Sequence, residues 1–229
     1  MENFSFRNVS FAYPVQENKA LRNISFEVGQ GEFIILCGPS GCGKSTLLRH
    51  LKTCLTPHGV LTGEILFDGK ALNEVDERTQ SQEIGFVLQS PENQVVTDKV
   101  WHELAFGLES LGLDTPTIRR RVAEVAAFFG IENWFYKNVT ELSGGQKQLL
   151  SLASVMAMSP KILVLDEPTA QLDPIAAADF LALLGKINRE LGITVILTEH
   201  RLEEAFPFAT RVIVMENGEI VCDDTPDKV

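Results

Sequence analysis

The chain has 229 residues, of which 45% are hydrophobic and 22% are charged, and this composition excludes a disordered protein. The length favours one compact domain with room for an inserted subdomain. Lys and Arg number 20 and Asp and Glu number 31, which gives a formal net charge of −11. Because nucleic-acid-binding proteins normally carry a basic surface, we expect no nucleic acid partner.

The sequence predicts neither a membrane-spanning segment nor a metal-binding cysteine cluster. No apolar run approaches the roughly 20 residues that cross a bilayer, and the N-terminal residues lack the pattern of a signal peptide. The four cysteines, Cys37, Cys42, Cys54 and Cys222, form no CxxC pair, so their spacing gives no zinc site. Unpaired cysteines fit a reducing cytosol.

The first third of the chain has the patterns of β-strands. Apolar and polar residues alternate through the first thirty residues, around Phe4, Phe6, Ile24 and Phe26, which predicts short antiparallel strands. The continuous apolar run 33–37 predicts a strand that is buried on both faces, as in a parallel sheet. A helix near 44–54 and strands at 63–69 and 84–88 are expected to follow.

The middle of the chain changes to helical periodicity. We expect one helix capped by Thr97, a second over 117–129 that ends at Gly130, and a third over 143–158. The alternation of strand and helix then resumes, with a strand at 162–165, a helix at 174–191 and a strand at 194–198. A final hairpin carries the type I′ turn signal Asn217-Gly218.

Residues 38–46 match the pattern GxxxxGK[ST] of a phosphate-binding loop. They are Gly38, Pro39, Ser40, Gly41, Cys42, Gly43, Lys44, Ser45 and Thr46. Glycines let the backbone curl so that successive N–H groups point at one anion, beside a helix N-terminus. Lys44 supplies a positive charge for the β- and γ-phosphates, and Ser45 a hydroxyl for Mg²⁺. An ordinary glycine-rich turn is the alternative, but the buried strand before the loop and the helix after it favour phosphate binding.

The predicted strand 162–165 leads directly into two carboxylates, Asp166 and Glu167. Adjacent residues on a strand point to opposite sides, so the two groups cannot do the same job. Asp166 suits a ligand of Mg²⁺, and Glu167 can polarise an attacking water. Acids often end strands without any function, but beside a phosphate-binding loop this pair predicts a metal ligand and a catalytic base.

The third central helix opens with Ser143, Gly144, Gly145 and Gln146. A helix N-terminus of this kind can hold a phosphate, and one nucleotide does not need two such cradles on one chain. With the phosphate-binding loop and the carboxylate pair, this LSGGQ segment resembles the signature of the ATP-binding cassette (ABC) ATPases, and the resemblance spans essentially the whole chain. It implies ATP and Mg²⁺ as cofactors and a second ATPase domain, identical or paralogous, packed head to tail. In such a pair the LSGGQ of one subunit closes on the γ-phosphate bound by the other.

Four further residues match family positions in register. Tyr13 lies where an aromatic ring stacks on adenine, with a core strand residue as the alternative. Gln89 matches the Q-loop, which reaches the Mg²⁺ and the water, and Asp173 matches the D-loop, which crosses to the partner subunit. His200 matches the switch histidine that contacts the γ-phosphate, although a lone histidine after a strand is more often structural. The resemblance thus adds Gln89 to the expected metal ligands, and it adds Gln89, His200 and Lys44 to the expected catalytic groups beside Glu167.

The resemblance implies an α/β fold of the P-loop NTPase type, with an N-terminal antiparallel β region and a helical subdomain inserted at about 90–158. Residues 1–229 would form a single nucleotide-binding domain. Near the end, Thr225 fits a helix N-cap and Pro226 the first helical position. One explanation is a single frayed turn, and the other, which we expect, is a chain truncated at its C-terminus or half of a tandem protein.

Two segments depart from the family pattern. After LSGGQ the family usually continues with x-Gln-Arg, whereas this chain has Lys147, Gln148 and Leu149. The departure removes a positive charge beside that helix. Ala170 and Gln171 stand where Ser-Ala is more usual, which is a milder change.

Residues 90–109 and 198–204 resemble the ATPases of energy-coupling factor (ECF) transporters, which import vitamins and transition-metal ions. The resemblance implies ATP hydrolysis that powers import, at the cytoplasmic face of the membrane. It also implies a groove near residues 89–109 that receives coupling helices of a transmembrane subunit. Because those helices carry arginines, Glu92, Asp98 or Glu103 are candidate partners, and a solvated helix face is the alternative for each.

Other functional classes explain less of the sequence. Another branch of the ABC transporters is the nearest alternative. DNA-repair members of the family carry a long insertion between the Q-loop and LSGGQ, and the spacing from Gln89 to Ser143 leaves no room for one. A P-loop kinase would not need LSGGQ or His200.

Cys42 lies two residues before Lys44. A helix N-terminus and a nearby lysine favour the thiolate form of a cysteine. We therefore expect a maleimide to react chiefly with Cys42 and Mg-ATP to shield it. The alternative is that Cys42 packs beneath the loop and does not meet solvent.

Overall fold

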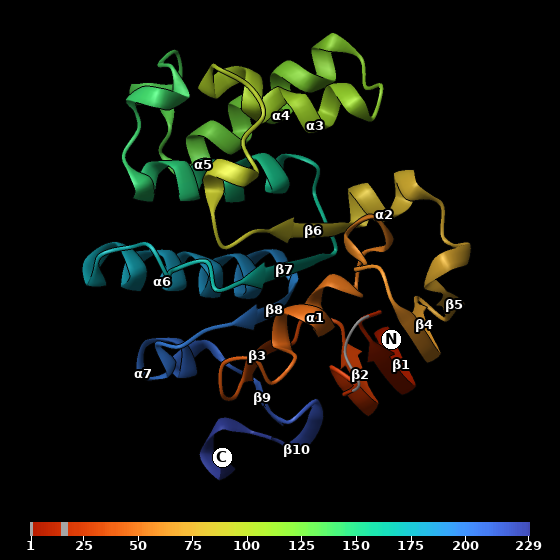
Figure 1. Ribbon diagram of the computed structural model, residues 1–229. Coiled ribbons are helices and arrows are strands. Elements are labelled where there is room, and N and C mark those ends of the chain that lie inside the picture. Colours follow the sequence, from red (N-terminus) through yellow and green to blue (C-terminus); the bar gives the residue numbers. More distant parts are fainter. Residues whose placement is uncertain (1, 15–17) are drawn as a thin grey trace.

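The computed structural model describes residues 2–14 and 18–229, which form two β-sheets and a set of helices (Figure 1). The smaller sheet is antiparallel, with the strand order β2-β1-β4-β5. Its strands are β1 (Glu2–Ala12), β2 (Leu21–Gly29), β4 (Val60–Phe67) and β5 (Lys70–Ala71). Phe4, Phe6 and Ile24 are buried beneath it, so the predicted N-terminal antiparallel region is confirmed.

The larger sheet has the strand order β10-β9-β3-β8-β7-β6. It contains β3 (Phe33–Cys37), β6 (Ile84–Val87), β7 (Ile162–Asp166), β8 (Thr194–Thr198), β9 (Arg211–Glu216) and β10 (Glu219–Asp224). All neighbours are parallel except β9 and β10. Asn217 and Gly218 join these two strands with φ of 50° and 83°, the left-handed pair that a type I′ turn requires.

The larger sheet is buried on both faces by different partners. In β3, Phe33 and Ile35 belong to a core shared with the helices, whereas Ile34 and Leu36 belong to a core shared with the antiparallel sheet. Successive strand residues point to opposite faces, so a strand with two apolar neighbours needs no polar alternation. The continuous apolar run 33–37 therefore has the parallel-sheet role that the sequence predicts.

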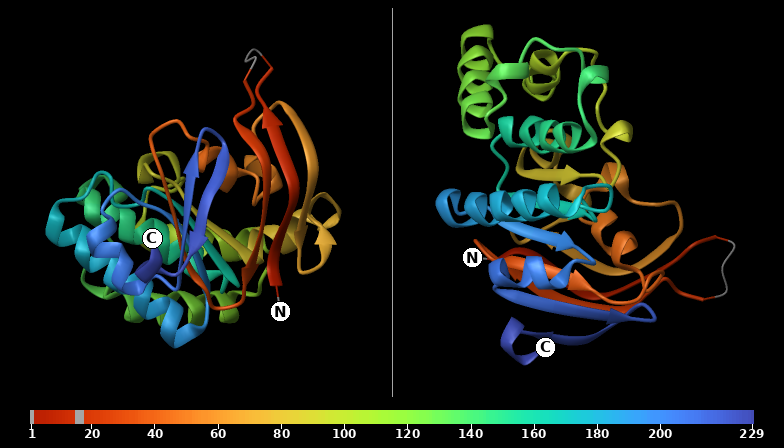
Figure 2. Two further views of the ribbon diagram at one scale, coloured as in Figure 1. Left: turned by 90° about the horizontal axis from the view of Figure 1, so that it is seen from below. Right: turned by 90° about the vertical axis from the view of Figure 1, so that its left-hand side faces the viewer.

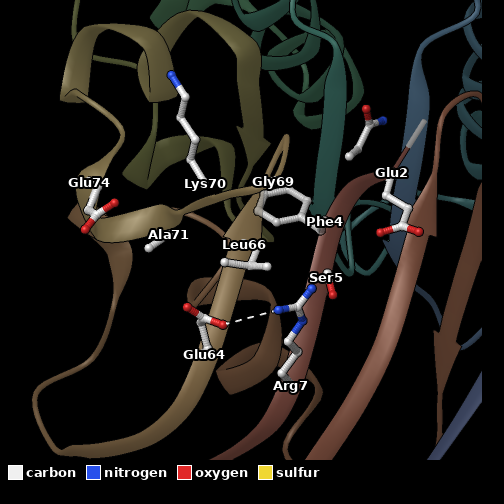
Figure 3. Close-up of a pocket in the computed structure, with 11 residues that line it drawn as sticks. Glu2, Phe4, Ser5, Arg7, Glu64, Leu66, Gly69, Lys70, Ala71 and Glu74 are labelled. Carbon is white, nitrogen blue, oxygen red and sulfur yellow. Dashed lines mark ion pairs between the residues drawn. The ribbon is translucent and has the colours of Figure 1, made fainter.

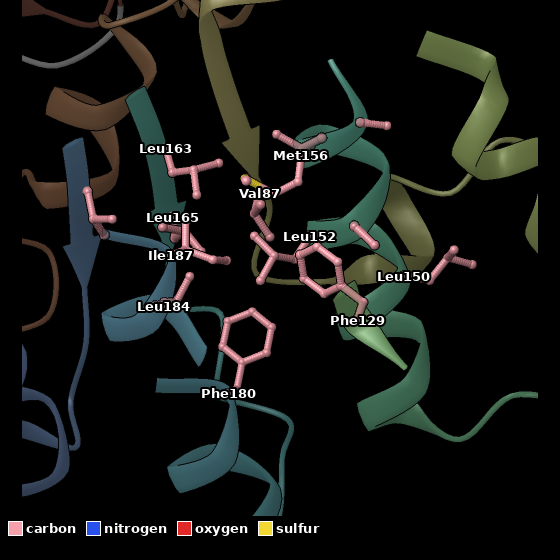
Figure 4. Packing of buried hydrophobic residues seen from close by; sticks show 14 of the residues in the cluster. Val87, Phe129, Leu150, Leu152, Met156, Leu163, Leu165, Phe180, Leu184 and Ile187 are labelled. Carbon is pink, nitrogen blue, oxygen red and sulfur yellow. The ribbon is translucent and has the colours of Figure 1, made fainter. Parts of the chain in front are cut away.

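The helices divide between the two faces. They are α1 (Lys44–Arg49), α2 (Glu77–Glu83), α3 (Val100–Ser110), α4 (Thr115–Phe129), α5 (Gly144–Ala157), α6 (Pro174–Leu191) and α7 (Leu202–Ala205). Helix α1 packs in the core beneath the antiparallel sheet, and α6 packs on the opposite face of the larger sheet. Figure 4 shows Phe180 and Leu184 of α6 meeting Leu152 of α5 and Leu165 of β7 in that second core.

Helices α3, α4 and α5 form a separate group beyond the edge strand β6, at the opposite end of the molecule from β9 and β10 (Figure 2). Their range falls within the helical subdomain predicted at about 90–158. In the described part of the chain, no helix is both long enough and apolar enough to span a bilayer.

Several predicted boundaries differ from the structure. Helix α1 ends at Arg49, and residues 53–55 form a separate 3-10 turn. Thr97 is not the cap of α3, which begins at Val100 after Lys99, because the Thr97 hydroxyl donates instead to Glu103 Oε2 (2.9 Å) and to the Lys99 carbonyl oxygen (3.1 Å). Helix α4 begins two residues early, because the Asp114 carboxylate caps it. Residues 226–228 form one 3-10 turn.

Candidate functional site

The phosphate-binding loop joins the end of β3 to the start of α1. Gly38, Gly41 and Gly43 have φ of 139°, 79° and 110°, a region that L side chains rarely adopt. A Cβ on Gly38 would lie 2.0 Å from the Met215 carbonyl oxygen, so the backbone fits here only with glycine. The loop is therefore shaped by close backbone approach, as the sequence predicts.

Lys44 is 6% exposed, and its ammonium group lies inside the loop. Nζ donates to the carbonyl oxygens of Gly38 (2.8 Å) and Pro39 (3.0 Å). A buried ammonium held by two carbonyls is fixed in position at the mouth of α1. It can therefore act as a preplaced positive charge for an anion in the loop.

A cavity of about 470 Å³ opens above this loop. Its lining includes Tyr13, Ser40, Gly41, Gly43, Lys44, Ser45, Thr46 and Glu167, together with Asn18, Lys19, Ala20, Arg22, Asn217 and Gly218. Tyr13 reaches the loop, because its hydroxyl lies 3.0 Å from Thr46 Oγ1. The cavity is thus lined by both an aromatic ring and the phosphate-binding loop.

Asp166 joins three neighbouring strand ends. Its Oδ1 accepts hydrogen bonds from Ser45 Oγ (2.9 Å) and from Thr198 Oγ1 (2.9 Å). Ser45 follows β3, Asp166 ends β7, and Thr198 ends β8 between them in the sheet. A hydroxyl and a carboxylate at this distance are the oxygen donors that Mg²⁺ prefers, so Ser45 and Asp166 fit the predicted metal site.

Glu167 has a left-handed backbone conformation, with φ of 47°. Such strain in a non-glycine residue persists only where the surroundings enforce it, and here the Glu167 amide donates to Thr198 (2.9 Å to Oγ1). The carboxylate meets two other predicted residues. Oε2 accepts from Gln89 Nε2 (2.9 Å), and Oε1 lies 2.9 Å from His200 Nε2. The structure therefore brings Gln89, Glu167 and His200 together.

The LSGGQ segment lies elsewhere. Ser143 caps α5 in a reciprocal box, with Gln146 N donating to Ser143 Oγ (3.2 Å) and Ser143 N donating to Gln146 Oε1 (3.0 Å). The described residues that line the loop cavity do not include residues 143–146, and α5 and α1 pack on opposite faces of the larger sheet. Asp173 caps α6, where Oδ1 accepts from Ile175 N and Ala176 N (both 3.0 Å).

A family model described as ABC transporter matches residues 21–170 of this chain. The chain belongs to the ABC transporter family. A Bacillus cereus protein named as an ABC transporter ATP-binding protein is 55% identical over 222 residues, which cover 97% of this chain and 40% of the relative. A Methanosarcina acetivorans protein of the same name is 38% identical over 223 residues, which cover 97% of this chain and 68% of that relative. The chain thus spans well under half of the Bacillus relative.

Solved structures of ABC cassettes share the fold. CbiO1 of Clostridium perfringens, described as part of the ABC transporter complex CbiONQ, has a TM-score of 0.88 at 31% identity and covers 99% of this chain and 90% of its own. The cassette MJ0796, in a dimeric post-hydrolysis state with ADP and phosphate, has a TM-score of 0.83 at 29% identity. The match covers 97% of this chain and 98% of the MJ0796 chain. The predicted ABC-type ATPase fold is therefore confirmed.

Sequence reasoning missed the roles of two residues that support this site, Thr198 and Glu199. Glu199 is 3% exposed, and its Oε1 accepts from the amides of His200 (2.7 Å) and Arg201 (3.1 Å). The hydroxyl of Thr169 donates to the other oxygen. Thr198 holds both Asp166 and Glu167, as described above. The signal was the polar run Thr198-Glu199 at the end of an apolar strand, since buried polar groups there need partners.

The candidate coupling groove is a cavity of about 650 Å³ between α2, α3 and α5, whose lining includes the exposed apolar residues Val96 and Phe106. Glu103 is the wrong candidate for an arginine partner. It is 4% exposed, and its Oε2 accepts from the amides of Val96 (3.2 Å) and Thr97 (2.9 Å). The carboxylate therefore stabilises its own loop. Asp98 is exposed.

Glu92 connects this region of the cassette to the signature helix. Its carboxylate forms an ion pair with Lys147 Nζ (3.1 Å). Gln148 is 1% exposed and donates to the Leu88 carbonyl oxygen (3.4 Å), while Leu149 packs against the helical core. In place of the arginine usual in the family, α5 thus carries one ion pair to the Q-loop and one apolar contact.

A different cavity of about 470 Å³ lies on the antiparallel sheet (Figure 3). Its charged lining includes an exposed ion pair between Arg7 and Glu64 (3.6 Å). None of the predicted site residues is among the described residues that line it. This cavity is separate from the nucleotide chemistry of the cassette.

The expected reactivity of Cys42 is wrong, because its side chain is 5% exposed and packs beneath the loop in the core. Cys54 is exposed instead.

We expect a maleimide to modify Cys54 in the native protein and to leave Cys42 and Cys37 intact, since burial also raises the pKa of the Cys37 thiol. Peptide mapping checks this, and a Cys54→Ser variant is the control. Rapid labelling of Cys42 that Mg-ATP prevents would show that the loop opens in solution.

Proposed function

We propose that this cassette hydrolyses ATP to ADP and phosphate as the motor of an ECF-type importer for a micronutrient. The observation that carries the ATPase part is the convergence of Lys44, Asp166, Glu167 and His200 on one edge of the larger sheet. The ECF part is supported by the likeness of residues 90–109 to ECF ATPases. The structural similarity to CbiO1 of an ABC transporter complex supports it too.

The cavity offers one place for each part of the nucleotide. We assign the phosphates to residues 38–46, where backbone N–H groups and the helix N-terminus favour anions, and the adenine to the ring of Tyr13. Ser45 and Asp166 would hold Mg²⁺, and Gln89 would join them from the Q-loop. When bound, Mg²⁺ neutralises charge on the phosphate oxygens. Lys44 adds a positive charge that is already in position before the nucleotide arrives.

Glu167 is the general base in this proposal. Its carboxylate takes the proton from a water that attacks the γ-phosphate, and Gln89 and His200 orient it through the 2.9 Å contacts already described. His200 then lies where it can also donate to the γ-phosphate. Positioning and charge neutralisation account for most of such catalysis, because the transferred phosphoryl needs no covalent help.

A complete site would need two cassettes. Ser143 and Gly144 are exposed, and they are not among the described residues that line the cavity above the phosphate-binding loop. A partner packed head to tail could bring its LSGGQ to the phosphates of this chain, with Asp173 at the crossing loop. The partner could be an identical copy, a paralogue or another part of a longer protein. The dimeric state of MJ0796 supports this arrangement.

Glu167→Gln is expected to slow ATP hydrolysis by about 10²–10⁴-fold and to leave ATP binding intact, because only proton acceptance is lost. Steady-state phosphate release and equilibrium binding measure the two effects. Glu204→Gln, an exposed carboxylate on α7, is the matched control and should retain activity. Turnover near that of the unaltered chain in Glu167→Gln would move the base to another residue.

Ser143→Arg is expected to abolish hydrolysis while preserving ATP binding, because the altered helix serves the partner's phosphates. The specific activity of the unaltered chain should rise with protein concentration for the same reason. Loss of a helix cap costs about 0.5–2 kcal/mol, so Asp114→Ala, which removes the cap of α4, controls for stability. Concentration-independent activity in a monomer verified by ultracentrifugation contradicts the two-cassette site.

Substitutions in the groove between α2, α3 and α5 test whether this groove binds a transmembrane subunit. We expect affinity purification from detergent-solubilised membranes to recover an integral membrane protein, and Phe106→Asp to abolish its recovery, because a charge enters an apolar groove. Tyr136→Asp, at a residue that is 79% exposed on the same subdomain, is the matched control. Recovery of a small vitamin- or metal-binding membrane protein would support the ECF branch. Recovery of other permeases would favour another ABC branch, and of ribosomes or DNA a soluble ABC ATPase.

A further inference from the structure

Four side chains form a closed ring behind the nucleotide cavity. The Tyr13 hydroxyl lies 3.0 Å from Thr46 Oγ1. Tyr13 meets Phe11 edge to face, with ring centroids 4.9 Å apart. Phe11 meets His50 in the same way at 4.5 Å, and His50 Nδ1 lies 2.7 Å from the Thr46 carbonyl oxygen. The ring thus links Phe11 near the end of β1, and Tyr13 just after it, to Thr46 in α1 and to His50, the C-cap of that helix.

His50 has the properties of a fixed neutral side chain. It is 1% exposed. Nδ1 faces a carbonyl oxygen, so Nδ1 carries the proton, and Nε2 is buried with no hydrogen-bond partner among the residues that the structure describes. Burial lowers the pKa of His50. The hydrogen bond to the Thr46 backbone raises the pKa, but this effect is smaller than that of burial. Protonation of Nε2 would leave a buried N–H unsatisfied.

Phe11 cannot move away from this contact. It is 1% exposed, and on another side it touches the backbone of Gly59, where an added Cβ would lie 2.4 Å from Phe11 Cζ. His50, Gly59 and Tyr13 therefore surround the Phe11 ring. The Tyr13 ring in turn rests on Phe11, so its orientation depends on a side chain that His50 fixes.

We propose that His50 is a positioning residue that sets Tyr13 for the nucleotide base and thereby the affinity for the base relative to the phosphates. The inference rests on the proposed function, in which Tyr13 stacks on adenine. A ring held in place before binding loses less conformational entropy when the base arrives. His50 is not among the described residues that line the cavity, so in this proposal it acts on the base through Phe11 and Tyr13.

The test separates base binding from phosphate binding. Dissociation constants for ADP and for inorganic pyrophosphate, both with Mg²⁺, are measured by calorimetry on the intact chain. His50→Asn keeps a donor near the Nδ1 position and loses the ring. We expect it to weaken ADP binding by about 3- to 10-fold, the equivalent of one aromatic edge contact, with pyrophosphate binding changed less than about 2-fold. His50→Phe keeps a ring against Phe11 and should restore the ADP-to-pyrophosphate ratio of the unaltered chain.

Leu48→Ala is the matched control, because Leu48 is equally buried, lies two residues before His50 in α1 and has no part in the ring. It should lower thermal stability and leave the affinity ratio unchanged. Equal weakening of both ligands in His50→Asn would overturn the inference, since His50 would then only support the helix. Tyr13→Ala distinguishes the two proposals. If Tyr13→Ala leaves ADP affinity unchanged, base stacking fails and the inference with it. If it weakens ADP and His50→Asn does not, only the role of His50 fails.

Discussion

The hydrogen bonds of the Thr198 hydroxyl and the Asp166 carboxylate hold the catalytic edge of this domain together. Asp166 accepts from Ser45 and Thr198, each at 2.9 Å, and so ties the phosphate-binding loop to the central strands. The same Thr198 hydroxyl accepts from the strained amide of Glu167. One buried cluster therefore sets both the candidate metal site and the direction of the candidate base. Buried polar groups of this kind are costly unless every partner is present, which makes the geometry specific.

The larger sheet gives this cluster its rigidity. Its central strands are apolar on both faces because two different cores enclose them, and parallel neighbours place their carboxyl ends along one edge. The loops that follow β3, β6, β7 and β8 are far apart in the sequence, and they thus meet at this one edge of the sheet. Glu199 extends this principle, since its carboxylate holds the amides of the His200 loop and the hydroxyl of Thr169 from the adjacent loop.

The signature segment and the candidate base site belong to different parts of this ABC domain. The signature helix α5 belongs to the helical group beyond β6 (Figure 1), and its Ser143 is engaged in a cap that leaves the first-turn glycines free for an external anion. The Tyr13 side of the cavity instead depends on Phe11 of β1, which packs against Tyr13 and His50. In the proposed function, nucleotide binding therefore draws on the antiparallel sheet, partner recognition draws on the helical group, and the larger sheet connects them.

The sequence alone determined the family, the loop 38–46, the carboxylate pair and most of the longer strands and helices, because these depend on local pattern: glycine spacing, apolar runs and capping residues. Helix α6 and strand β8 have the predicted bounds for this reason. The local pattern held no sign of β5, α2 or α7, which are short. The tertiary structure alone decided that Cys42 is buried, that Glu103 serves its own loop, that Glu199 holds the His200 loop and that His50 packs against Phe11. Burial and hydrogen-bond partners arise between residues far apart in the chain, such as Asn3 and Thr194 or Gln89 and Glu167, and no local pattern records which distant group a side chain will meet.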